Sequence, residues 1–236
     1  LYGVHAVAAA LQNPRRKLRR LLATADGEAA LLAELGGPPP GRLRPERTER
    51  ARFATFLPED SVHQGVALLL EPLQPVPLEE AIAASAGPVL LLDQVTDVRN
   101  VGAILRSAAA FGAAAVVMQD RHAPQETGAL ARAASGMLER VPVVREVNIA
   151  RTIQTLQRQG FWTLGLAGDA PRTLAQALHG IGERRVALVL GAEDAGLRRL
   201  QREACDELVR LPMVEGVESL NVAAATAVAL YELVRE

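Results

Sequence analysis

From Gly87 onward, short apolar runs alternate with segments whose apolar residues recur at helical spacing. The runs are continuous rather than alternating with polar residues, which is typical of strands covered on both faces of a parallel sheet. Predicted strands cover residues 89–95, 114–118, 141–145, 161–167, 186–190 and 208–211. Predicted helices cover residues 101–111, 126–138, 149–159, 174–178, 197–204 and 222–234. This alternation predicts an α/β fold.

The first 70 residues have a mixed pattern that predicts a small α+β unit. Its predicted helices cover residues 4–11, 28–35 and 48–57, and its predicted strands cover residues 18–23, 41–44 and 65–70. Residues 71–77 contain three prolines, which is typical of a semi-rigid linker, and residues 78–86 form a possible short helix. We therefore expect a domain at 1–70, a linker at 71–86 and a second domain at 87–236.

Composition narrows the class of protein. The chain has 236 residues, of which 49% are hydrophobic, so it can bury a sizeable core. Its one cysteine, Cys205, cannot form an internal disulfide, which favours a reducing compartment, and we expect a cytoplasmic protein. No apolar run reaches the ~18 residues of a membrane span. The sequence starts at Leu1 rather than Met, so we expect further residues upstream.

Charge is unevenly distributed, although the net charge is only −1. Residues 1–70 contain 10 arginines and lysines against 7 aspartates and glutamates. Five of the basic residues form one cluster: Arg15, Arg16, Lys17, Arg19 and Arg20. Such a cluster can bind RNA phosphates, and it is equally compatible with a solvated helix end.

Three polar turns follow three of the predicted strands. The first carries Asn100 and leads into a small-residue helix with Arg106, the second carries Glu193, and the third carries Ser219 and Asn221. Because ligands bind outside the carboxyl ends of strands in open α/β sheets, these turns are candidate site loops. Asn100 is a possible cap of the helix that follows it, and Ser219 and Asn221 are both good N-cap residues.

Several common site signatures are missing from the sequence. No glycine fingerprint of a dinucleotide-binding fold, no phosphate-binding P-loop and no nucleophile elbow occurs. The four histidines are scattered and do not pair with the cysteine at zinc-site spacing, so we expect no metal.

The three turns together resemble the ordered motifs of the SpoU (TrmH-like) branch of the SPOUT RNA methyltransferases. The motifs are N-x-G-x-x-x-R from Asn100, G-A-E-x-x-G from Gly191 and S-L-N-V from Ser219. The resemblance covers most of residues 87–236. YGVHAV at Tyr2 and VHQGV at Val62 resemble the ends of the L30e-like substrate-binding domain of enzymes that 2′-O-methylate a guanosine of large-subunit ribosomal RNA.

This resemblance implies an S-adenosylmethionine-dependent RNA 2′-O-methyltransferase that acts as a homodimer, with the partner chain helping to complete the site. It also implies an α/β sheet whose C-terminal part forms a deep trefoil knot. The cofactor-binding residues carried over by motif position are Gly191, Leu211 and Leu220, with Ala167 and Gly168 as further neighbours. The polar catalytic set carried over is Asn100, Arg106, Glu193, Ser219 and Asn221.

The sequence departs from the family pattern at two positions. Val98 stands where many relatives have proline, which leaves the turn before Asn100 less restricted, and Asp194 stands where glycine often follows the motif glutamate.

Glycine at position 191 is expected to let the cofactor approach the backbone, because it has no Cβ.

The role of Arg106 has two interpretations. The family proposal makes it the proton acceptor, but a guanidinium has no acceptor atom and a pKa above ~12. Alternatively, Arg106 stays charged, stabilises the developing alkoxide and is oriented by Glu193. A purely structural Glu193–Arg106 ion pair remains a further interpretation.

Other functions remain open as well. The target is either ribosomal or transfer RNA. A non-catalytic RNA-binding protein that retains the fold is a rival hypothesis, and so is a nucleotide-dependent oxidoreductase on a doubly wound sheet.

Overall fold

The structure is a computed structural model that describes residues 1–41, 43–121, 123–193, 195–214, 216–217 and 219–235. The chain divides into two units. The first contains Leu1–Gln74 and Pro124–Arg140, and the second contains Pro75–Ala123 and Val141–Glu236. Residues 124–140 thus cluster with the N-terminal part of the chain, although the sequence pattern predicted them as part of a second domain at 87–236.

The first unit is built on a three-stranded sheet in the order β2-β1-β3. Strand β1 (Leu18–Ala23) pairs parallel to β2 (Pro45–Arg47) and antiparallel to β3 (Val66–Leu70). Helices α1 (Val4–Gln12) and α2 (Ala25–Leu35) cover one face, and Val7, Leu21 and Leu31 are fully buried there. The predicted strand at 65–70 is confirmed, whereas the one predicted at 41–44 is wrong because residues 45–47 pair with β1 instead.

The other face of this sheet carries much less structure. Helix α3 (Arg50–Phe53) is one turn long, so the helix predicted for 48–57 is wrong in length. After Phe53, the backbone continues in turns that bond to the third residue back, such as Phe56 N–H to the Phe53 carbonyl at 3.2 Å, and Pro58 follows. Phe53 is buried against Leu22 and Ala67, and it anchors this short segment to the sheet.

The helix predicted for 126–138 is interrupted. It forms α6 (Gly128–Ala133) and a short 3-10 helix η1 (Met137–Glu139), separated by Ser135 and Gly136 at φ 47° and 82°. A side chain at Gly136 would lie 2.7 Å from the Cβ of Ala9 in α1. Close packing on α1 therefore explains the break, and it attaches this segment to the first unit.

The second unit is built on a seven-stranded sheet in the order β6-β5-β4-β9-β7-β10-β8. Every strand pair in it is parallel, which confirms the predicted α/β class with a parallel sheet. The strands are β4 (Val89–Asp93), β5 (Ala115–Gln119), β6 (Val143–Glu146), β7 (Trp162–Leu166), β8 (Arg172–Thr173), β9 (Val186–Gly191) and β10 (Glu207–Arg210). Strand β8 was not predicted, because two residues leave no readable pattern.

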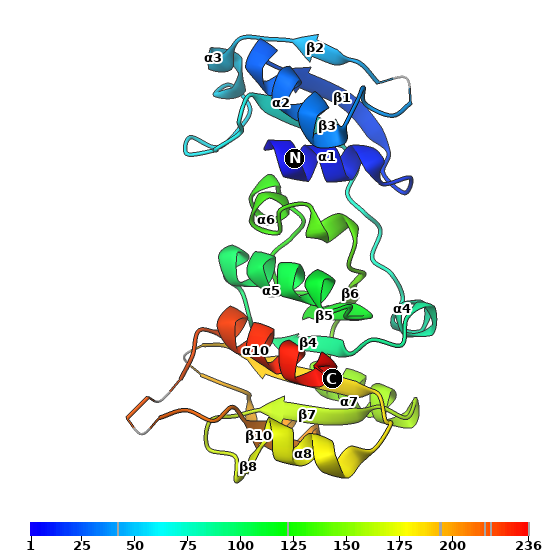
Figure 1. Cartoon of the computed structure of the whole chain (residues 1–236), viewed down its shortest axis with the longest axis vertical. Coiled ribbons are helices and arrows are strands. Elements are labelled where there is room, and N and C mark those ends of the chain that lie inside the picture. The colour runs from blue at the N-terminus through cyan, green and yellow to red at the C-terminus, as the bar shows by residue number, and fades with distance from the viewer. Residues whose placement is uncertain (42, 122, 194, 215, 218, 236) are drawn as a thin grey trace. The chain divides into compact units, whose positions relative to one another are not determined.

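Helices cover both faces of this sheet. Helices α5 (Val98–Ala110) and α10 (Val222–Val234) lie side by side, as Figure 1 shows in green and red. Helices α4 (Leu78–Ala84) and α7 (Ile149–Arg158) pack against Val89, Leu91 and Val189. Every residue of β4 is buried, as the continuous apolar run predicted. The remaining helices are α8 (Leu174–Ile181) and α9 (Arg199–Ala204).

The strand order determines where the polar turns meet. Strands β4, β9, β7 and β10 are consecutive neighbours and run in the same direction, so their carboxyl ends lie along one edge. The turns that follow these strands carry the residues singled out from the sequence. In the described part of the chain, no helix has both the length and the apolar character needed to cross a membrane.

Candidate active site at the carboxyl edge of the sheet

A pocket of about 400 Å³ opens at the carboxyl ends of β7, β9 and β10. All five predicted cofactor-binding residues line it: Ala167, Gly168, Gly191, Leu211 and Leu220. Glu193 and Ser219 of the predicted polar set line it too. Its volume lies in the range of small-molecule sites, and its walls combine apolar side chains with turn backbone and a few carboxylates. These walls suit a ligand with an apolar ring and polar or cationic groups.

Three polar side chains from three separate turns meet beside this pocket. The Asn221 amide donates from Nδ2 to Asn100 Oδ1 at 2.9 Å and to Glu193 Oε2 at 3.2 Å. The Asn100 amide also approaches Glu193 Oε2, at 3.4 Å. The structure therefore brings together three of the five predicted polar residues, and Glu193 belongs to both the cluster and the pocket wall.

Helix caps hold two members of this cluster in place. Asn221 is the N-cap of α10, since its Oδ1 accepts from the backbone N–H of Ala223 and Ala224, and this confirms it as a capping residue. The prediction that Asn100 caps α5 is wrong. Asp97 is that cap, because its carboxylate accepts from the backbone N–H of Arg99 and Asn100. Asn100 therefore lies in the first turn of the helix, with its amide free to join the cluster.

The backbone of the turn after β9 requires glycine at position 191, which the sequence did not reveal. An added Cβ would lie 2.1 Å from the Gly196 carbonyl carbon and 2.3 Å from the Leu197 nitrogen. The turn closes here, with Gly196 N–H bonded to the Ala192 carbonyl at 2.8 Å and Gly196 at φ 62°. Gly191 thus allows the turn that carries Glu193 to fold back on itself.

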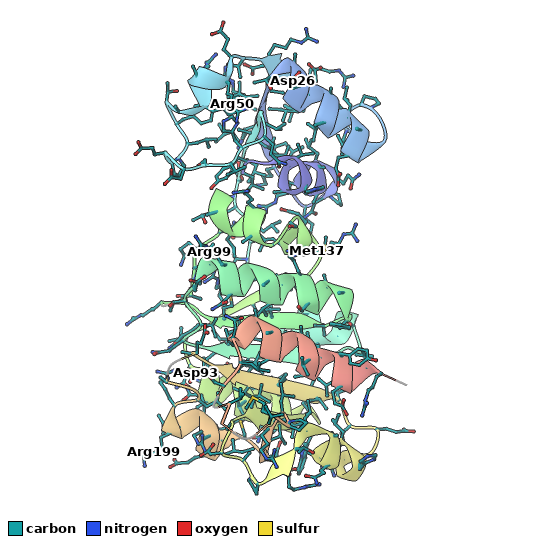
Figure 2. The ribbon with its side chains drawn as sticks, turned by 60° about the vertical axis from the view of Figure 1, so that its left-hand side comes forward. Asp26, Arg50, Asp93, Arg99, Met137 and Arg199 are labelled. Atoms are coloured by element: carbon teal, nitrogen blue, oxygen red, sulfur yellow. The ribbon has the colours of Figure 1, made fainter. Side chains whose placement is uncertain are left out.

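An ion pair between a buried aspartate and a partly exposed arginine, which sequence reasoning missed, connects two of the turns. Asp93, at the end of β4, is fully buried and accepts from Arg198 Nε at 3.0 Å and from the Arg198 backbone N–H at 3.2 Å. Figure 2 labels Asp93 in the second unit. A carboxylate that directly follows an apolar strand was the available signal, since a buried charge needs a partner.

A second pair, also not predicted, forms part of the pocket rim. Asp169 and Arg202 both line the pocket, and Arg202 Nη2 donates to Asp169 Oδ2 at 2.8 Å. This hydrogen bond, together with the charge of Arg202, lowers the pKa of the Asp169 carboxyl group. The rim therefore keeps a charged carboxylate near the loop that follows β7.

Within the described residues of one chain, Arg106 forms no hydrogen bond with the Asn100–Glu193–Asn221 cluster. It is exposed on the same face of α5 as Arg99, seven residues earlier, while Ile104 and Leu105 are buried. Within the described residues, Arg106 makes no ion pair or side-chain hydrogen bond, so the Glu193–Arg106 pair considered from the sequence does not form here. Glu193 bonds to the two asparagines instead.

The basic segment 15–20 is divided between buried and exposed residues. The Arg16 side chain is fully buried and pairs with Glu126 at 2.5 Å and Glu139 at 2.6 Å. Burial by itself would lower the pKa of Arg16, but the hydrogen bonds and charges of Glu139 and Glu126 outweigh it and raise that pKa. Both carboxylates belong to the segment 124–140. Arg16 therefore joins two parts of the first unit and has no free surface for RNA.

The other members of the segment are on the surface. Lys17 and Arg19 both pair with Glu71, and Arg20 makes a two-pronged contact with Glu46. Arg15 is exposed and makes no ion pair within the described residues. Glu71 and Glu46 thus neutralise part of the positive charge that was counted from the sequence.

Two further expectations concern metal binding and Asp194. Among the described residues, no group of three or more His, Cys, Asp or Glu side chains is placed to hold a metal ion. Asp194, the departure next to Glu193, lies outside the described residues.

Two family models match the sequence. The model of the SpoU rRNA Methylase family matches residues 87–231, and the model described as RNA 2'-O ribose methyltransferase substrate binding matches residues 1–76. The 23S rRNA (guanosine-2'-O-)-methyltransferase RlmB of Pseudomonas putida is 38% identical over 243 residues, covering 100% of this chain and 96% of the relative. The protein of the same name from Escherichia coli is 37% identical over 240 residues, covering 100% and 98%.

Solved structures with the same fold include the SpoU methyltransferase AviRb from Streptomyces viridochromogenes in complex with AdoMet. It matches with a TM-score of 0.81 at 23% identity, covering 100% of this chain and 88% of that one. A structure of a TrmH-family protein from Porphyromonas gingivalis matches with a TM-score of 0.79 at 29% identity and the same coverage.

Proposed function

This chain belongs to the SpoU rRNA methylase family, and from that premise we propose that it methylates the 2′-hydroxyl of a guanosine in large-subunit ribosomal RNA. The methyl donor is S-adenosylmethionine, the AdoMet of the AviRb complex. One observation carries the proposal: the pocket of about 400 Å³ shares Glu193 with the Asn100–Glu193–Asn221 cluster. A donor site and a polar acceptor site are therefore adjacent.

The pocket residues fit this cofactor by their chemistry. Leu211 and Leu220 offer apolar contact to an adenine ring, and the turns at Ala167–Gly168 and Gly191 offer backbone groups for hydrogen bonds. The carboxylates of Glu193 and Asp169 suit the cationic groups of the cofactor. When bound, S-adenosylmethionine supplies a methyl group on a positively charged sulfur.

The polar residues have the task of positioning the ribose and handling its proton. A bound cofactor would supply the methyl group to O2′ and leave as the neutral thioether, and the hydroxyl proton would pass to the Glu193 carboxylate, the proton acceptor of the cluster, or to water. We assign Asn100, Glu193 and Asn221 to holding the ribose in line, which is mainly a matter of orientation. Ser219, exposed at the pocket rim, is assigned to the same acceptor side.

We assign Arg106 to stabilising the negative charge that develops on O2′. A guanidinium cannot accept the proton, but it can bind an alkoxide or an adjacent phosphate. Its lack of a partner among the described residues supports a role toward RNA rather than a structural one. Because Arg106 does not join the cluster of its own chain, we further propose a homodimer in which Arg106 acts beside the pocket of the second copy.

Mixing two inactive variants tests this arrangement. Arg106→Ala removes the cation, and Leu220→Trp fills the pocket from an exposed loop position. If the site is shared between copies, mixed dimers regain transfer, because each contains one intact combination. If Arg106 serves its own chain, mixing the variants restores no activity.

The N-terminal unit is proposed to be the substrate-binding part, in an L30e-like fold. The proposed organisation is a substrate-binding domain at 1–70, a linker at 71–86 and a catalytic domain at 87–236. We also propose that the C-terminal part of the catalytic domain forms a trefoil knot. The match of residues 1–76 to a substrate-binding family supports this division. We propose that the exposed residues Arg15, Lys17, Arg19 and Arg20 contact RNA, and we place the protein in the cytoplasm with its ribosomal substrate.

The deciding experiment is transfer of a labelled methyl group from S-adenosylmethionine to RNA. Ribosomal RNA from a strain lacking the gene should accept one 2′-O-methyl group, which can be mapped to a guanosine. Transfer RNA from the same strain should accept none. Incorporation into transfer RNA alone would change the substrate class, and incorporation into neither would leave a non-catalytic RNA-binding protein.

A further inference from the structure

A second pocket, of about 440 Å³, lies within the first unit and has no role in the chemistry described above. It opens over the sheet face opposite helices α1 and α2. On this face the cross-strand pairs Arg20–Leu69 and Leu22–Ala67 lie side by side, because alternate residues of a strand point the same way. The single-turn helix α3 covers only part of this face, and the remainder forms the pocket.

The pocket combines an apolar floor with an exposed aromatic ring. Leu22 and Ala67 are buried at its base, while Leu69 and Phe56 remain 62% and 47% exposed. Phe56 is supported by the buried Phe53, with ring centroids 5.8 Å apart. A large apolar side chain on a strand and a supported aromatic ring at a pocket mouth together indicate a surface for a flat apolar partner.

The rim of the same pocket is positively charged. Arg20 and Arg52 both line it, and Arg52 makes no ion pair within the described residues. One carboxylate, Glu46, faces these two guanidinium groups, and its pKa is lowered by its hydrogen bond to Arg20 and by the charges of Arg20 and Arg52. Two cations against one anion leave a positive balance beside the aromatic ring.

We propose that this pocket binds an unpaired nucleobase of the RNA substrate, with Phe56 stacking on the base and Arg52 contacting the adjacent phosphate. Single-stranded RNA is recognised in this way, by aromatic stacking combined with a cationic rim. The positive rim disfavours an apolar protein helix or a second copy that would bury Arg52 without a partner. The proposal rests on the RNA-modifying function above and adds a contact distant from the chemistry in sequence.

The test measures binding of a fluorescein-labelled single-stranded RNA of about ten nucleotides by anisotropy, with the full chain. Phe56→Ala should weaken binding by about tenfold, and Phe56→Trp should retain it, because stacking depends on a π face. Arg52→Ala should weaken binding and reduce the salt slope by about one. An RNA with abasic sites should bind the wild type and Phe56→Ala alike.

Matched controls lie on the same segment. Arg50 shares α3 with Arg52, is exposed and does not line the pocket (Figure 2 labels Arg50), so Arg50→Ala should bind RNA as the wild type does. Val62, 51% exposed in the same unit and also outside the pocket, provides Val62→Ala as the apolar control. Far-ultraviolet circular dichroism of Phe56→Ala checks that the unit stays folded.

The outcomes separate this inference from the proposed function. If the wild type methylates RNA but Phe56→Ala leaves RNA affinity and the KM for RNA unchanged, the nucleobase pocket is wrong. If Phe56→Ala instead alters the sedimentation coefficient while RNA affinity is unchanged, the face is a protein interface and the proposal is also overturned. If Phe56→Ala binds RNA more weakly than the wild type, but the wild type transfers no methyl group, the nucleobase pocket is supported and the methyltransferase function is refuted.

Discussion

The basic segment 15–20 and helix α5 each contain an arginine that stands out in the sequence, and the surroundings of the two arginines differ in the structure. Arg16 is buried between Glu126 and Glu139. Arg106 is exposed on α5 with no partner among the described residues. An arginine with two carboxylates within reach becomes part of the fold, and one without any is available to a ligand. The two arginines therefore differ in the carboxylates that surround them, not in residue type.

The largest expected effect concerns Arg16. Arg16→Ala leaves Glu139 and Glu126 without their cation in a buried site, so the free energy of unfolding of the first unit should fall by about 3–5 kcal/mol. Urea denaturation measures this loss. Arg15→Ala, on the exposed neighbour, should change it by less than about 0.5 kcal/mol. Equal effects for the two variants would remove the contrast between buried and exposed arginines.

Arg106 should show the opposite behaviour, with little effect on stability and a large one on chemistry. Arg106→Ala should lower single-turnover methyl transfer by at least about 100-fold, the scale of losing one transition-state stabiliser. S-adenosylmethionine affinity, measured by calorimetry, should stay near that of the wild type. Arg106→Lys should recover part of the rate if charge alone matters, and none if the planar fork is needed.

Arg99→Ala is the matched control for this prediction. Arg99 is exposed on the same face of α5 and is labelled in Figure 2. It makes no ion pair within the described residues, so its loss removes a similar charge from the same helix. A rate loss as large as that of Arg106→Ala would point to the general charge of the helix rather than to one positioned guanidinium.

Asn221 sharpens the comparison because it serves both fold and site. Asn221→Ala removes the cap of α10, which should cost about 1 kcal/mol of stability, and also removes the two hydrogen bonds to Asn100 and Glu193. Asn221→Ser should restore thermal stability, since serine caps helices well. The rate of methyl transfer should be about tenfold below that of the wild type in both Asn221→Ala and Asn221→Ser, because serine cannot donate two amide hydrogens. Full recovery of transfer with serine would mean that Asn221 only caps the helix.

The smallest effect is expected for the exposed part of the basic segment. Lys17→Ala and Arg19→Ala should each change stability by less than about 1 kcal/mol, as surface ion pairs with Glu71 contribute little. Each should reduce the salt slope of RNA binding by about one if it contacts a phosphate. Glu71→Gln, which frees both cations, should raise RNA affinity. Unchanged slopes in all three variants would mark the segment as solvated surface.

Local features of this chain could be predicted from the sequence because their causes are local. Burial of β4 on both faces leaves a continuous apolar run, and Asn221 precedes an alanine-rich helix that it caps. The cap of α5 was misplaced, since Asp97 and Asn100 are both capping residue types and only backbone geometry decides between them. The five cofactor candidates were carried over from the resemblance to the SpoU motifs, and all five line one pocket.

Contacts between distant segments were decided by the tertiary structure alone. Arg16 meets Glu139 across 123 positions and Asp93 meets Arg198 across 105, and the sequence identifies the partner in neither pair. Charge energies depend on separations of a few ångströms, and these are set by which elements pack together. The sequence by itself therefore determined the parallel sheet and its candidate site turns. Only the packing of segment 124–140 against α1 decided that Arg16 is buried in a pair of ion pairs.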